Sequence, residues 1–437
     1  MKNSKKNEEE DNWGYRRYSI VVKKSSPYYQ EIDEICFKSK NLFNATLYNE
    51  RQSLFNTGKF RYYNKVNKDF TKNNQPDYRA LPAKVSKHTQ MKVNEAIKSF
   101  WSLKKSKKIN FTPKIPGYLK KNGRFVTEYE KDALSFQKEG FIKLSKTNIY
   151  ITIPKKLKTT EENNTKIIFQ VVRLVPKNGY YLIEILYKKS IPKKKKKKLT
   201  HQTRFASIDL GVNNLATVTS NVFQPLIVNG QPIKSINQYY NKNLKKKQRL
   251  LPANQYTSKS IRQLGYKREM KVNDYLHKSA AFLVNYLVSQ TIDVLVIGTN
   301  KGWKQNINIG KRSNQNFVGI PFYKFKQILT YLCEEKGIEI HEQEESYTSK
   351  ASFLDGDFIP TFVPESNTKY TFSGSRMCRG LYKTKNKKII NADVNGSLNI
   401  LKKFIDKNVT AEFQWSNLWN ELVEVYSTPH KVTVPIG

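Results

Sequence analysis

Cysteine and histidine are scarce in this chain, whose 437 residues include three cysteines and five histidines. Cys36, Cys333 and Cys378 lie far apart, and no Cys-X-X-Cys pair occurs. This spacing excludes a disulfide framework and gives no support to a Cys/His zinc site. Unpaired thiols are typical of a reducing compartment, so we expect an intracellular protein.

Acidic residues are also few, with 36 Asp and Glu against 78 Lys and Arg and a net charge of +42. Such an excess repels itself unless a polyanion neutralises it, and nucleic acid is the polyanion that this composition favours. A membrane surface is the weaker alternative, because no basic amphipathic helix stands alone in the sequence. Aromatic residues make up 12% of the chain, and those that lie among lysines also suit stacking on bases.

No apolar stretch approaches the ~20 residues of a membrane-spanning helix, so we expect no membrane partner. Residues 1–12 are charged and lack the apolar segment of a secretory signal, so we expect a disordered tail there. The abundance of Lys and Asn suggests an AT-rich genome, such as that of a bacterium or a large virus. We therefore expect the bacterial cytoplasm or nucleoid, or the nucleus if the host is eukaryotic or viral.

The first half of the chain mixes strand and helix signals. Helix signals begin at Ser26-Pro27 and Leu81-Pro82, each followed by apolar residues at helical spacing. Strand patterns cover residues 15–23, 142–153, 167–175 and 180–187, and Asn178-Gly179 between the last two favours a hairpin. We predict a small β-barrel or sheet from residues 13–25 and 104–192, with a helical domain at 26–103 inserted into it.

The second half has the element order of a ribonuclease H-like domain. A linker at 193–202 contains six consecutive lysines, which suit either a solvated connection or a role in nuclear import or phosphate contact. Residues 203–408 then predict a hairpin, helix, strand, helix, strand, insert and helix. We interpret the chain as a multidomain α/β and α+β protein, with an insert at 346–390 and a C-terminal tail at 409–437.

Two isolated acids stand at the ends of predicted elements in this second half. Asp209 ends the strand predicted at 205–210, just before a Gly-Val-Asn-Asn turn, and Asp393 opens the last helix. Taken alone, Asp209 is more often a turn-former than a ligand. Together in a basic protein, two carboxylates on separate elements suit divalent-metal and phosphate chemistry.

Several separated motifs resemble one protein family. In the second half these are ASIDLGVNNLATV, VIGTNKGWKQNINIGKRSNQNFVGIPF, EESYTSKASFLD and INADVNGSLNIL, and in the first half ALPAKVS, IKSFWSLKK and VVRLVPKNGYYLIEILY. They resemble the transposon-encoded TnpB (OrfB) proteins, to which the eukaryotic and viral Fanzor proteins are related. The resemblance extends over nearly the whole chain and marks the second half as a RuvC nuclease domain.

The resemblance implies an RNA-guided DNA endonuclease with a wedge β-barrel and an inserted helical recognition domain. It further implies a guide RNA from the transposon end, a double-stranded DNA target beside a short flanking motif, and two Mg²⁺ ions that Mn²⁺ can replace. The protein is expected to be a monomer. Guide pairing would select the sequence, and the protein would read the flanking motif and the backbone.

Two departures from the family pattern concern metal ligands. Most relatives carry a glutamate where this chain has Gly298, and a four-cysteine zinc ribbon where residues 353–390 hold only Cys378. The strands predicted at 293–297 and 338–342 should be parallel neighbours, so Glu345, just after the second, could reach the same edge of the sheet. Glu344 is the alternative, and both could be plain loop acids.

The resulting mechanism is two-metal phosphodiester hydrolysis. Asp209 would bridge two Mg²⁺ ions while Glu345 and Asp393 would each hold one. Candidate nucleic-acid contacts are Trp303, Lys304, Gln305, Lys311, Arg312, Arg376 and Arg379, although Trp303 suits core packing equally well. Asp355 and Asp357 are candidates to contact the metal ligands without binding the metal themselves.

Two other functions are alternatives to RNA-guided DNA cleavage. An RNA-guided DNA-binding repressor would share the fold, charge and RNA but would not need three converging acids. A transposase in the strict sense finds little support, because no two of the five histidines adjoin and no nucleophilic tyrosine is evident.

The single cysteine of the insert yields a first prediction. Because a zinc ribbon needs about four thiolate or imidazole ligands, the purified protein should contain no zinc. Elemental analysis of protein prepared without chelator tests this, and about one zinc per chain would contradict it.

Overall fold

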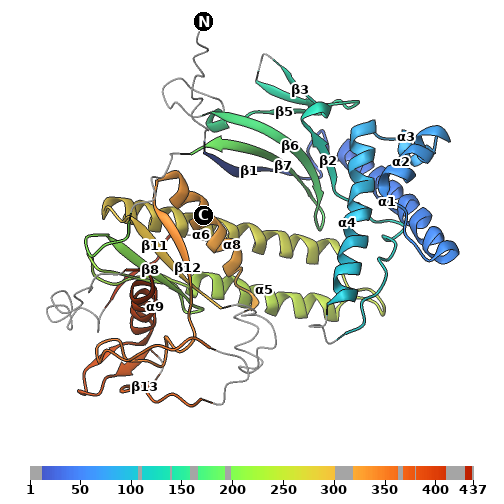
Figure 1. Ribbon diagram of the computed structural model, residues 1–437. Helices are drawn as coiled ribbons and strands as arrows, with labels where there is room; N and C mark the ends of the chain where they lie inside the picture. The colour runs from blue at the N-terminus through green and yellow to red at the C-terminus, as the bar shows by residue number, and fades with distance from the viewer. Residues whose placement is uncertain are drawn as a thin grey trace, which may run out of the picture. The chain divides into compact units, whose positions relative to one another are not determined.

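The computed structural model describes residues 12–106, 111–137, 140–157, 166–191, 198–300, 318–362, 368–378, 380–409 and 429–435. The chain divides into two compact units, Met1–Ile191 and Pro192–Gly437 (Figure 1). Sheets and helices occur in both, as the predicted multidomain α/β and α+β class requires. Among the described residues, no helix combines the length and apolar character needed to cross a membrane.

The first unit contains two antiparallel sheets. The larger has the order β1 (Trp13–Val22), β7 (Tyr181–Ser190), β6 (Ile167–Pro176) and β2 (Thr127–Glu130). The smaller has the order β3 (Leu134–Gln137), β4 (Phe141–Leu144) and β5 (Tyr150–Thr152), with 3₁₀ turns at Lys131–Ala133 and Lys155–Leu157. The hairpin predicted at Asn178-Gly179 is confirmed, with Gly179 at φ 95°. The single strand predicted over 142–153 is wrong, because the chain reverses there between β4 and β5.

Helices occupy the chain between β1 and β2, where the insertion was predicted. They are α1 (Tyr29–Thr57), α2 (Tyr63–Lys72), α3 (Pro76–Arg79) and α4 (Ala83–Lys105). The first and last begin within a few residues of their predicted starts, whereas α2 and α3 lie in a basic, aromatic stretch without a clear period. Val66 and Phe70, one turn apart on α2, are buried with Ile32 of α1 and with Val172 and Leu174 of β6. Helices and both sheets therefore share one apolar core.

The second unit is built on a six-stranded sheet. Its order is β12 (Glu339–Glu344), β11 (Val294–Thr299), β8 (Phe205–Leu210), β9 (Asn214–Ser220), β10 (Leu226–Asn229) and β16 (His430–Val432). The predicted hairpin is β8–β9, and β11 and β12 are parallel neighbours as predicted. The parallel pairing of β11 with β8 was not predicted. Sequence patterns missed β10. The predicted C-terminal tail differs too, because β16 pairs in parallel with β10.

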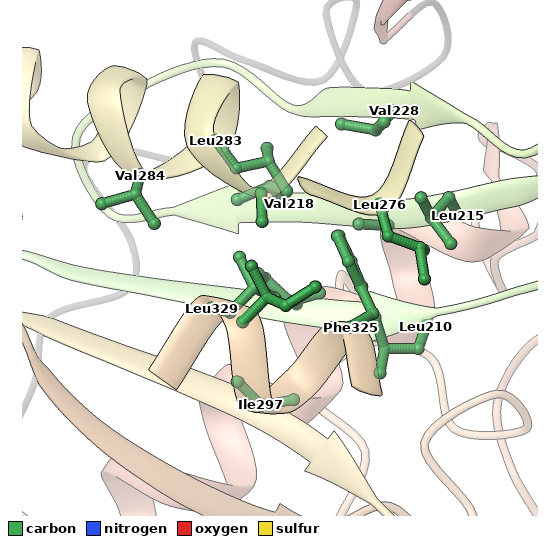
Figure 2. Packing of buried hydrophobic residues seen from close by; sticks show 14 of the residues in the cluster. Leu210, Leu215, Val218, Val228, Leu276, Leu283, Val284, Ile297, Phe325 and Leu329 are labelled. Atoms are coloured by element: carbon green, nitrogen blue, oxygen red, sulfur yellow. The ribbon is translucent and has the colours of Figure 1, made fainter. Parts of the chain in front are cut away.

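Helices cover both faces of this sheet. They are α5 (Gln231–Arg249), α6 (Lys259–Ser289), α8 (Phe322–Glu335) and α9 (Ala392–Asn408). On β8, Ile208 and Leu210 face the core that includes α6 and α8, while Phe205 packs against Phe404 of α9 on the other face. Figure 2 shows Phe325 of α8 beside the strand that carries Leu210. Because side chains alternate along a strand, Asp209 shares the α9 face with Phe205.

The described part of the insert forms a small sheet without cysteine ligands. Its strands are β13 (Ser375–Cys378), β14 (Leu381–Lys383) and β15 (Ile389–Asn391). Tyr382 is buried with Phe353 and donates a hydrogen bond to the Lys350 carbonyl at 2.7 Å. Asp355 accepts from the Lys385 amide at 2.8 Å, and Asp357 accepts from the Ser373 hydroxyl at 2.6 Å. Packing and hydrogen bonds thus hold this region together, and the two aspartates act within the insert.

The core between α8 and the sheet gives a stability prediction. Phe325 is fully buried, whereas Tyr323 on the same helix is 68% exposed. Phe325→Ala should therefore lower the free energy of unfolding by about 3–5 kcal/mol, through lost burial and a new cavity. Tyr323→Ala should change it by less than about 0.5 kcal/mol. Urea unfolding of both variants measures the difference, and equal losses would contradict the packing described.

Candidate metal-binding site

Three acids come together at one edge of the six-stranded sheet. Asp209 is near the end of β8, Glu345 directly follows the last residue of β12, and Asp393 lies in the first turn of α9. Because β8, β11 and β12 are parallel, their carboxyl ends open on the same edge. All three acids are half-buried, so the site faces solvent.

Small residues let α9 approach β8 closely. A Cβ added to Gly396 would lie 2.9 Å from Oδ2 of Asp209, too close for any side chain. One residue further along α9, the Ser397 carbonyl accepts a hydrogen bond from the Ser207 hydroxyl at 2.8 Å. The glycine therefore leaves the space that the Asp209 carboxylate needs beneath the helix.

Gly298 makes a corresponding space for Glu345. A Cβ added to Gly298 would lie 2.8 Å from Oε2 of Glu345 and 2.6 Å from Cδ1 of Ile400. Any side chain here would displace the Glu345 carboxylate or the end of the Ile400 side chain. The space that a side chain at position 298 would take is thus occupied by the Glu345 carboxylate and the end of the Ile400 side chain.

The carboxylates disfavour one another's charge. Removal from water raises the pKa of Asp209 well above its ordinary value, and the nearby charges of Glu345 and Asp393 raise it further, while Arg376 acts in the opposite direction. Burial, followed by the charge of Glu344, raises the pKa of Glu345 to about 7. Oε2 of Glu345 is buried without a hydrogen-bond partner. This edge therefore carries negative charge that the described residues do not fully balance.

Glu344 has different surroundings. Its Oε2 accepts from the Lys403 ammonium at 2.6 Å, and its Oε1 accepts from the Ser346 amide at 2.7 Å. Burial acts to raise its pKa, but these hydrogen bonds outweigh it and lower the pKa. Glu344 is thus paired on both oxygens, whereas Glu345 has an unpaired one.

Asn214 is a site residue that the sequence patterns did not reveal. Its side-chain amide donates to Oδ2 of Asp393 at 2.6 Å. The Asn391 side chain accepts from the backbone amides of Asp393 and Val394, and so caps α9. The sequence pattern places Asn214 only in the Gly-Val-Asn-Asn turn that follows Asp209. Its contact becomes visible only when the hairpin and α9 are brought together.

The chemistry of this edge suits a divalent cation. Within the described residues, no group of three or more His, Cys, Asp or Glu side chains is arranged so that it could hold a metal ion as it stands. However, an unpaired buried carboxylate oxygen beside two further carboxylates is the oxygen-rich, negative donor set that hard cations prefer. Asp209, Glu345 and Asp393 supply these carboxylates.

Most of the predicted nucleic-acid contacts lie outside the described residues. These are Trp303, Lys304, Gln305, Lys311, Arg312 and Arg379. Arg376 is described and exposed on β13, and its charge favours the ionised form of Asp209. It is thus the predicted contact that the structure associates with the acidic edge.

The fold and site define a ribonuclease H-like domain with a carboxylate-lined edge. The model of the OrfB family, described as a probable transposase, matches residues 184–304, and that of the Cas12f1-like TNB domain matches residues 322–400. Over these segments the chain is similar to the TnpB proteins.

A curated relative is the TnpB-like protein ORF457 of Acidianus two-tailed virus. It is 25% identical over 404 residues, which cover 84% of this chain and 82% of that protein. Among solved structures, a Cas12f1–sgRNA–target DNA complex is 15% identical with a TM-score of 0.32, covering 88% of this chain and 98% of that one. C2c1 of Alicyclobacillus acidoterrestris with single-guide RNA is 9% identical with a TM-score of 0.38, covering 86% and 70%. These structural likenesses are weak, and the similarity to the TnpB proteins rests on the sequence matches.

The contact between Gly396 and Asp209 can be tested with a matched glycine. Gly396→Ala should displace the Asp209 carboxylate and weaken Mn²⁺ binding by about 10–100-fold, the effect of disturbing a ligand's support. Gly265→Ala on α6 adds a Cβ that meets nothing within 4 Å, and should leave the affinity unchanged. Alanine favours a helix at both positions, so a loss at 396 alone reports the close approach. Calorimetry measures both, and equal affinities would contradict the geometry.

Proposed function

We propose that this chain is an RNA-guided DNA endonuclease of a transposable element, which hydrolyses target DNA beside a short flanking motif. The observation that carries the proposal is the set of three carboxylates at one sheet edge, with an unpaired buried oxygen on Glu345. The similarity to the TnpB proteins and the charge of +42 support nucleic acid as the substrate.

Asp209, Glu345 and Asp393 are the proposed ligands of two Mg²⁺ ions. When bound, such ions supply an activated water and stabilise the leaving oxygen of the phosphodiester. The role of Asn214 is to hold Asp393 through its hydrogen bond to Oδ2. Arg376, exposed beside the acids, is suited to the DNA phosphate that must enter this negative edge.

Glu345 is proposed over Glu344 because of what each carboxylate already binds. Glu344 is neutralised by Lys403 and would have to give up that ion pair before binding a metal. Glu345 has no such partner on Oε2. This oxygen lies 2.8 Å from the point where a Cβ of residue 298 would be. The glutamate that most relatives carry on the strand is thus supplied here from the following loop.

The second candidate is an RNA-guided repressor that binds DNA without cutting it. It accounts equally well for the positive charge and the family match. It gives no reason, however, for placing Glu345 and Asp393 where burial and their charges raise the pKa of Asp209, since such an arrangement is costly unless it serves a ligand. We therefore favour the nuclease.

Substitution of the two neighbouring glutamates distinguishes these proposals. Glu345→Gln should reduce Mg²⁺-dependent cleavage by more than about 100-fold, beyond the usual cost of losing a ligand's support. Binding of guide RNA and target DNA should stay within about twofold, because the phosphate contacts that dominate affinity are untouched. Glu344→Gln keeps an acceptor for Lys403 and should cost about fivefold or less, the net value of one hydrogen bond.

Cleavage assays with both variants on a pre-assembled RNA complex make this measurement. If Glu344→Gln abolishes cutting while Glu345→Gln does not, the ligand assignment is wrong. A wild-type complex that binds target but never cuts in Mg²⁺ or Mn²⁺ would establish the repressor.

RNA association gives an independent prediction. Co-expressed with the transposon-end RNA, the protein should purify with that RNA at low salt. Affinity should fall by about 10³-fold or more between 50 and 200 mM salt, because each Lys or Arg contact with phosphate releases counterions. Recovery of protein free of nucleic acid at low salt would contradict the RNA-guided function.

A further inference from the structure

Glu345 lies on a loop rather than on a strand, so the sheet does not hold its carboxylate in place. A carboxylate at position 298 would stand on a paired strand, because Gly298 pairs with Gln343 of β12 and its neighbour Ile297 pairs with Ile208 of β8. Glu345 lies beyond β12, and its Oε2 makes no hydrogen bond that could orient it. A metal ligand on a loop needs the loop itself to be held.

Three side chains of α9 hold this loop. Asn395, Asn399 and Lys403 are spaced by four residues and so lie on one face of the helix, and all three are buried. Asn395 donates to the Ala351 carbonyl at 2.8 Å and accepts from the Phe353 amide at 3.0 Å. Lys403 donates to the Pro360 carbonyl at 2.9 Å in addition to Glu344.

Asn399 lies at the centre of this row. Its side-chain amide donates to the Thr348 carbonyl at 2.8 Å and to the Ala351 carbonyl at 2.7 Å. Thr348 in turn donates from its hydroxyl to the Glu345 carbonyl at 2.8 Å and from its backbone amide at 3.2 Å. A continuous series of hydrogen bonds thus runs from the helix to the backbone of Glu345.

The loop conformation needs this support. Tyr347, between Glu345 and Thr348, has φ 65°, in the left-handed region that bulky side chains rarely adopt. Such a conformation persists where the surroundings impose it. Asn399 also lowers the stability of the fold in one respect, because its Oδ1 is buried without a hydrogen-bond partner. An apolar side chain at this position would avoid that desolvation cost.

We propose that Asn399, assisted by Asn395 and Lys403, is a positioning residue that holds the loop of Glu345 so that its carboxylate can serve a divalent cation. The inference rests on the proposed function of Glu345 as a metal ligand. It adds the reason why a glutamate can leave the strand: the helix that carries Asp393 also fixes the replacement.

The test compares two asparagines of the same helix. Asn399→Leu removes both donors to the loop, whereas Asn408→Leu removes only a bond to the Phe404 carbonyl of α9 itself. We expect Asn399→Leu to weaken Mn²⁺ binding by about tenfold or more and to raise the Mg²⁺ concentration needed for half-maximal cleavage equally. Binding of guide and target should not change, and Asn408→Leu should match the wild type.

A relocated carboxylate separates positioning from a general structural role. In the double variant Gly298→Glu, Glu345→Gly the acid returns to the strand, where it no longer depends on the loop. Adding Asn399→Leu there should then leave Mn²⁺ affinity unchanged. If Asn399→Leu costs the same in both backgrounds, or nothing in the wild type, the positioning role is refuted.

A second variant and a separate measurement of metal binding distinguish failure of the positioning role from failure of the nuclease proposal. Should Asn399→Leu fail to fold, Thr348→Val removes the hydroxyl bond to Glu345 with little change in shape, and should weaken Mn²⁺ binding in the same direction. Should the wild type bind Mn²⁺ through Glu345 but never cut DNA, the nuclease proposal fails while the positioning role is still decided by calorimetry.

Discussion

The close contact between α9 and β8 is the constraint on which the acidic edge depends. Helices usually pack on a sheet through large side chains, which keep the backbones well apart. Here Gly396 lies against the Asp209 carboxylate, and Ser207 and Ser397 are hydrogen-bonded beside it. Further along, Phe205 and Phe404 restore ordinary apolar packing. The helix is thus anchored at one end by an apolar contact and brought close at the other, where its first turn presents Asp393.

That closeness has an electrostatic cost. Bringing carboxylates together in a partly dry place raises their pKa values, and an apolar site of the same shape would be easier to fold. The chain limits the cost locally. Lys403 neutralises Glu344, Asn214 supports Asp393, and the charge of Arg376 opposes the rise at Asp209. The negative charge that remains unbalanced is centred on Glu345, and a bound cation or proton would neutralise it.

The sequence predicted those features that depend on local pattern. The parallel pairing of β11 with β12 follows from two apolar runs joined through a helix, so the sheet edge that Glu345 reaches could be foreseen. The insertion of helices between β1 and β2 was also foreseeable, because proline and serine mark their starts. The hairpin at Gly179 followed from a two-residue turn signal.

Other features depend on contacts distant in sequence and could not be foreseen. The different surroundings of Glu344 and Glu345 are created by Lys403, which lies on another element. Asn214 is indistinguishable from a turn residue until α9 lies beside it. The strand β16 is three residues long and has no periodicity to detect, and it exists only because β10 offers an unpaired edge.

The pairing of β10 with β16 has a consequence for how the second unit is made. Leu226 pairs with His430, so the ribosome must synthesise almost the whole unit between the two partners. Until the last strand emerges, β10 presents an open row of backbone donors and acceptors, the kind of edge on which other chains can add. Completion of the sheet is therefore a late event in biosynthesis. A chain interrupted before residue 430 would carry all three acids and yet expose the unpaired edge of β10, on which other chains can add.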